Sequence, residues 1–92
     1  MRIMEQGESG TSAALETAPA GDTAERLFEL GLMCCAGREA APDLVSAHKW
    51  FNLAAMRGNA EAKRYRMEIA REMSKHEIAA AQRQAREWLA WH

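Results

Sequence analysis

Residues 24–62 form the stretch AERLFELGLMCCAGREAAPDLVSAHKWFNLAAMRGNAEA, which decides the fold. It holds two apolar patterns of helical period, separated by residues 37–43 and closed by residues 58–59. Small residues of one pattern face large residues of the other, which lets two antiparallel helices pack closely. The small residues are Gly31, Ala47, Ala54 and Ala55, and the large ones are Leu27, Phe28, Trp50 and Phe51. The pattern predicts an α/α hairpin, which offers a surface rather than a reactive site.

Capping residues set the expected helix boundaries, and we predict helices over residues 23–36, 43–57, 60–72 and 75–91. Two pairs have the spacing of a capping box, namely Asp22 with Glu25 and Ser74 with Glu77. Asp43 and Asn59 are expected to cap the second and third helices. Gly37 and Gly58 are expected to end the first and second helices in the left-handed conformation.

Helical spacing also predicts the buried face of each helix. The first helix is expected to bury Ala24, Leu27, Phe28, Gly31 and Cys34. The third is expected to bury Ala62, Tyr65, Ile69 and Met73, and the fourth Ile78, Ala81, Ala85, Trp88 and Leu89. Glycine inside a helix costs about 1 kcal/mol relative to alanine. Gly31 therefore predicts a close approach of the second helix, with Trp50 or Phe51 over it.

The same residues resemble a repeat signature. They are Leu30, Gly31, Gly37, Asp43, Ala47, Trp50, Phe51, Ala54, Ala55, Gly58 and Ala62. In this register they resemble the Sel-one-like repeat, an α/α relative of the tetratricopeptide repeat, over one unit and the opening of a second. Cys34 and Glu39 stand where the family usually has Tyr and Gly. The resemblance implies an all-α fold, a short antiparallel α/α-hairpin solenoid of about one and a half repeats. The fourth helix would cap its open end.

Proteins with this repeat typically act as adaptors, so the resemblance implies a non-enzymatic protein–protein interaction module. In related stacks the first helix of each unit lines the concave face. Carried onto this chain, Arg26, Glu29 and Leu32 are candidate partner contacts. Trp91 lies off the inner stripe of the fourth helix, and is either a frayed chain end or a contact with a partner. The partner would be another protein, or a second copy of the chain in a homodimer.

The chain of 92 residues has room for one small domain. Residues 1–21 are rich in small and acidic residues without periodicity, and are expected to form a disordered acidic tail before a repeat domain over residues 22–92. That tail lacks the pattern of a secretory signal. No apolar run reaches the roughly 18 residues of a membrane helix. We therefore expect a cytoplasmic protein in which the neighbouring thiols of Cys34 and Cys35 are reduced.

Candidate reactive residues do not form a known arrangement. His48, His76 and His92 show no metal-ligand spacing with each other or with the cysteines. The serines and glycines form neither a nucleophile beside a base nor a phosphate-binding loop. The sequence predicts no enzyme activity, no cofactor and no metal site.

Charge is divided unevenly along the chain. Residues 1–47 hold three basic and eight acidic residues, a net charge of −5, and residues 48–92 hold nine basic and five acidic, a net charge of +4. The third helix carries a basic cluster of Lys63, Arg64, Arg66 and Arg71, interleaved with Glu61, Glu68 and Glu72. A nucleic-acid-binding regulator using this helix is the alternative function. A protein whose function is its own assembly is a third.

Overall fold

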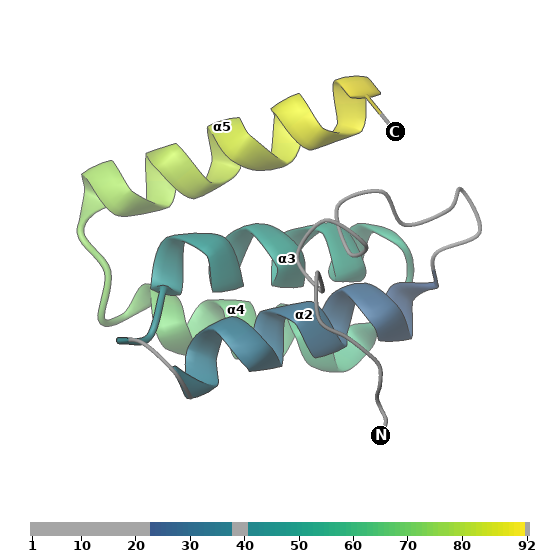
Figure 1. Cartoon of the computed structure of the whole chain (residues 1–92), viewed down its shortest axis with the longest axis horizontal. Helices are drawn as coiled ribbons and strands as arrows, with labels where there is room; N and C mark the ends of the chain where they lie inside the picture. The colour runs from purple at the N-terminus through teal and green to yellow at the C-terminus, as the bar shows by residue number, and fades with distance from the viewer. Residues whose placement is uncertain (1–22, 38–40, 92) are drawn as a thin grey trace.

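The computed structural model describes residues 23–37 and 41–91, and all regular secondary structure within them is α-helical. The helices are α2 (Ala24–Ala36), α3 (Leu44–Met56), α4 (Ala60–Ala70) and α5 (Lys75–Trp91). Figure 1 shows that successive helices run in opposite directions. The predicted all-α class is confirmed. The predicted tail over residues 1–21 lies outside the described residues.

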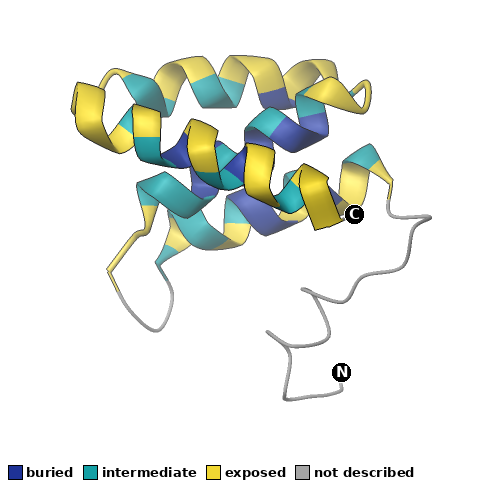
Figure 2. Cartoon of the chain, turned by 90° about the horizontal axis from the view of Figure 1, so that it is seen from above, coloured by how far each residue is buried: buried dark blue, intermediate teal, exposed yellow. Residues whose placement is uncertain are grey.

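α3 is the central helix and packs against each of the other three helices. α2 and α4 lie together on one side of α3, and α5 covers α3 from the other side (Figure 1). In the view from above, α5 crosses over α3 (Figure 2). The helix expected to cap the stack therefore lies on the central helix.

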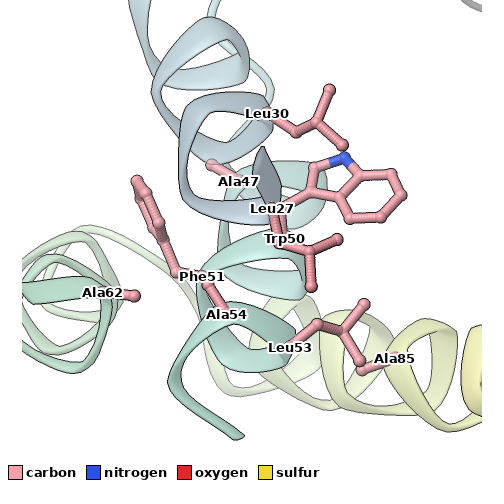
Figure 3. Packing of buried hydrophobic residues seen from close by; sticks show 9 residues of the cluster. All are labelled: Leu27, Leu30, Ala47, Trp50, Phe51, Leu53, Ala54, Ala62 and Ala85. Carbon is pink, nitrogen blue, oxygen red and sulfur yellow. The ribbon is translucent and has the colours of Figure 1, made fainter. Parts of the chain in front are cut away.

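The core combines three large side chains with several alanines. Leu27, Phe51 and Leu53 are the largest fully buried side chains, and Figure 3 shows them between the helices. The small buried residues are Ala47, Ala54, Ala62, Ala81 and Ala85. Because an alanine keeps two helix backbones close, its neighbours can interdigitate around it.

α2 and α3 approach closely at Gly31, which lies against the ring of Phe51. A Cβ added there would lie 2.5 Å from Cδ1 and 3.0 Å from Cζ of Phe51, and closer still to Cε1. Real Cβ atoms do not approach carbon so closely, so only glycine fits under the ring. The predicted close approach at Gly31 is confirmed, with Phe51 as the partner.

Most of the predicted caps are present. Asp43 accepts a hydrogen bond from the backbone N–H of Ser46, and Asn59 accepts one from that of Ala62. Gly37 and Gly58 have positive φ angles of 58° and 106°, so both adopt the conformation that glycine favours at helix ends.

The capping box predicted at Asp22 is wrong. α2 begins one residue later, with Thr23 as its N-cap, whose side-chain oxygen accepts a hydrogen bond from the N–H of Arg26 at 3.2 Å. Threonine is a favourable N-cap residue, and Thr23 has the extended backbone that an N-cap adopts, with φ −86° and ψ 163°. Glu25 is then two residues after the cap, too close to complete a capping box.

α4 ends at Ala70, two residues before its predicted end. The chain tightens there, since Glu72 N–H donates to the carbonyl of Ile69 and Met73 N–H to that of Ala70. The next capping box follows at once: Ser74 N–H donates to Glu77 Oε1 at 2.8 Å, and Glu77 N–H to Ser74 Oγ at 3.1 Å. This second predicted box is confirmed.

Eight residues expected to be buried are more exposed. Leu89 is 36% exposed, and the half-buried ones are Ala24, Phe28, Cys34, Tyr65, Ile69, Ile78 and Trp88. α5 contacts α3 through the small Ala81 and Ala85, so its buried stripe is narrow and does not reach Leu89. Phe28 is half-buried because none of the described helices covers the outer side of α2 and α4 (Figure 1).

Candidate protein-interaction surface

A half-buried apolar strip runs between α2 and α4 on the side away from α5. α2 contributes Phe28, Leu32 and Cys35, spaced by four and three residues, and α4 contributes Tyr65 and Ile69, spaced by four. Residues at these spacings share one helix face. All five pack against the buried core while keeping part of their surface exposed.

Aromatic contacts fix the two helices against each other. Tyr65 meets Phe28 edge to face with ring centroids 5.2 Å apart, and meets Phe51 at 5.5 Å. Phe28 also lies 5.7 Å from Phe51, so the three rings form one cluster across α2, α3 and α4. Such pairs add about 0.5–1.5 kcal/mol beyond area burial. These ring contacts fix the Phe28 and Tyr65 side chains of the strip against the core.

Acidic residues border this strip. On α4, Glu61 and Glu68 stand four residues before and three after Tyr65, so they share its side of the helix. Glu72 follows the end of α4 and acts electrostatically on Cys35 of the strip. On α2, Glu25 and Glu29 are exposed. We call the strip and these five carboxylates the α2/α4 face: Phe28, Leu32, Cys35, Tyr65 and Ile69 with Glu25, Glu29, Glu61, Glu68 and Glu72.

The candidate contacts predicted from the sequence do not all lie together. Leu32 is half-buried in the strip, and Glu29 lies at its border. Arg26 pairs with Glu29 at 3.5 Å, and both side chains are about half exposed, so the pair is weak. Trp91 is on α5, which covers the opposite side of α3, and is 85% exposed. The structure brings Arg26, Glu29 and Leu32 together and leaves Trp91 apart from them.

The cysteine thiols are held in their protonated form. Burial raises the pKa of Cys34, and the Asp43 carboxylate raises it further. Burial also raises the pKa of Cys35, with a further contribution from Glu72. Because the thiolate is the reactive species, these shifts make both side chains poor nucleophiles.

The remaining polar groups form structural contacts. His48 is 4% exposed, and its Nδ1 has no hydrogen-bond partner among the described residues. Burial lowers the pKa of the His48 imidazole, and Arg66 lowers it further, which favours the neutral form. The Ser46 hydroxyl donates to Asp43 Oδ2 at 2.7 Å. Across residues 23–37 and 41–91, no three His, Cys, Asp or Glu side chains are placed to hold a metal ion.

Two cations of the basic α4 cluster have partners within the fold. Arg66 donates a hydrogen bond to Asn52 Oδ1 of α3, and Arg64 pairs with Glu61 at 3.7 Å. The first contact turns Arg66 toward α3 instead of outward. The basic cluster is thus divided between two sides of α4.

Sequence reasoning missed two contacts that shape these surfaces. The ring of Trp88 meets that of Trp50 edge to face at 6.0 Å, which fixes α5 on α3. The contact between Phe28 and Tyr65 joins α2 to α4. Each of these residues has the helical spacing of an inner stripe, but the spacing does not say which other helix it meets.

In the part of the chain that the structure describes, no helix has both the length and the hydropathy to span a bilayer. No family model, curated protein or solved structure was found to match this chain.

Proposed function

We propose that this protein is a non-enzymatic protein–protein interaction module of the Sel-one-like repeat type, acting as an adaptor in the cytoplasm. The α2/α4 face is the binding surface. α2 and α4 are the first helices of the two units that the repeat resemblance implies. They lie on the same side of α3 (Figure 1), where the ring of Phe28 contacts that of Tyr65. That is the position of the concave face in related stacks.

The composition of the α2/α4 face is the observation that carries the proposal. A strip of five half-buried apolar side chains, two of them aromatic, is bordered by five carboxylates. Two of these pair with arginines, Glu29 with Arg26 and Glu61 with Arg64, and the other three are exposed. Aromatic side chains are enriched at the centres of interfaces, and polar residues at their rims. The chemistry of the border favours a basic segment with apolar residues as the partner.

Affinity capture on the full chain tests the proposal. We expect the immobilised chain to retain at least one protein that mass spectrometry identifies, and Glu29→Lys with Glu68→Lys to release it. Both residues are exposed, so the fold should tolerate the change. The control is Glu87→Lys, which makes the same kind of charge change at an exposed position of α5 and should leave capture unchanged. A protein retained equally by all three chains would show that the α2/α4 face does not bind it.

A further inference from the structure

Within residues 23–37 and 41–91, one side of the central helix is covered by no other helix. α2, α4 and α5 pack against α3, but the row Val45, Asn52 and Met56, spaced by seven and four residues, stays partly exposed. Met56 is 61% exposed at the end of this row. Positions at these spacings share one helix face. Val45 and Met56 stand at opposite ends of this row, with Lys49 and Asn52 between them.

The α4 side of this row carries cations and no acid. Arg66 reaches α3 and donates to Asn52, which fixes the side of α4 that adjoins the row. Lys63, three residues earlier, lies on that side and is exposed. The acidic residues of α4 lie on the other side, beside Tyr65, which contacts α2. α3 itself has no acidic residue between Leu44 and Met56.

The α5 side adds apolar surface. Trp88 packs on Trp50, and Leu89 follows about 100° further round the helix, with 36% of its surface exposed. Arg86 stands three residues before Leu89 and is exposed on that side. Glu87 stands two residues before Leu89, so it points away from it.

We call this surface the open α3 face: Val45, Asn52, Met56, Lys63, Arg66 and Leu89. We propose that it binds an acidic amphipathic helix of a partner protein. The proposal rests on the proposed interaction function and adds a second binding surface of opposite charge to the α2/α4 face. An apolar stripe on the partner helix would cover Met56 and Leu89. Glu or Asp residues beside that stripe would meet the cations.

The exposed apolar side chains and the neighbouring cations of the open α3 face both favour this occupant. The row follows α3, which has 13 residues, so it matches a partner helix of similar length. A nucleic acid would place phosphates against exposed Met56 and Leu89, which gain nothing from them. The Arg66 guanidinium already points toward Asn52. A carboxylate of the partner helix can therefore accept a second hydrogen bond from this guanidinium while it keeps its position.

The test is a nuclear magnetic resonance titration of the full chain, labelled with nitrogen-15. The probe is a synthetic acidic helix of about 16 residues with leucines spaced three and four apart and glutamates elsewhere. We expect shifts in the amides of Val45, Asn52, Met56 and Lys63, and weaker binding as salt rises. The same peptide with lysine in place of glutamate should not bind.

Paired variants locate the contact. Lys63→Glu and Met56→Glu should each weaken binding of the acidic peptide about tenfold. Two variants serve as controls. Arg64→Glu makes the same charge change at the next residue of α4, which points to the outer side of that helix. Met33→Glu replaces an exposed methionine of α2 by glutamate, as Met56→Glu does on α3. Both control positions are exposed, and both variants should bind as the unchanged protein does.

Four results would overturn the proposal: no shifts with millimolar peptide, shifts centred on the α2/α4 face, equal loss with Arg64→Glu, or equal binding of the lysine peptide. Duplex DNA that binds more tightly and is released by Lys63→Glu would assign the face to nucleic acid. An oligomer that Met56→Glu disperses would assign it to a second copy. Partner capture that depends on Glu29 and Glu68 would survive any of these outcomes, so the two proposals fail separately.

Discussion

Replacing Gly31 by alanine tests the packing of α2 on α3 with the smallest possible change. The added Cβ would lie 2.5 Å from Cδ1 of Phe51, a distance that forces a shift. Phe51 is fully buried, and its ring has Phe28 at 5.7 Å and Tyr65 at 5.5 Å. The ring therefore cannot turn away without disturbing two other aromatic side chains.

Two opposing effects set the magnitude. Alanine is favoured over glycine inside a helix by about 1 kcal/mol. Forcing an extra carbon into a packed core costs about 1–3 kcal/mol. At Gly31 the rigid ring cluster places the cost toward the upper end. We expect Gly31→Ala to lower the free energy of unfolding by about 2 kcal/mol net, and Gly31→Leu to lower it by a few kcal/mol.

Urea unfolding followed by circular dichroism measures both variants. A loss of 1 kcal/mol in a domain of this size corresponds to a fall in Tm of about 4–8 °C. The matched control places Gly31→Ala in a Phe51→Leu background, where the ring atoms that clash are gone. There alanine should be neutral or stabilising by up to about 1 kcal/mol. If Gly31→Ala stabilises the unchanged protein by that amount, the close contact does not exist.

Three further results are expected. Ser74→Ala removes the side chain that accepts from Glu77 N–H, so it should lower the free energy of unfolding by about 1 kcal/mol in urea titrations, and no change would mean that the box does not hold α5. The pKa of His48 is lowered in the folded state by burial and Arg66, so the unfolded state binds the proton more tightly. The stability that depends on neutral His48 should be fully present above its unfolded pKa of about 6.5 and should decrease as pH falls below it. His48→Gln should reduce the slope of the free energy of unfolding against pH. If the chain associates with itself through Trp91, which is 85% exposed, Tm should rise with protein concentration and Trp91→Ala should weaken the rise. A concentration-independent Tm would exclude self-association.

Local chemistry explains what the sequence could predict. Asp43, Asn59 and Ser74 cap helices because each side chain reaches a backbone N–H three residues later, and no distant residue affects that geometry. Gly31 was informative because glycine inside a helix needs a packing reason. The exception is Thr23, where two suitable capping residues stand next to each other and local pattern could not choose between them.

Contacts between distant helices account for what the sequence left undetermined. Helical spacing placed Tyr65 and Trp88 on inner stripes, but the direction of each helix decides that Tyr65 meets Phe28 and that Trp88 meets Trp50. The sequence groups Arg66 with the other cations of its helix. The hydrogen bond of Arg66 to Asn52 of α3 places its side chain on a different side of α4 from that of Arg64. The two charged surfaces therefore depend on packing that no single segment contains.

The central claim is that the α2/α4 face binds another protein. The most direct measurement places a photo-reactive amino acid at Glu29 or Glu68 of the full chain and crosslinks it inside the cells that make it. Both positions are exposed at the border of the apolar strip, and Arg83 on α5 is an exposed control position. We predict one discrete crosslinked protein shared by the two test positions and absent from the control. The same products from all three positions, or none from any, would contradict the claim.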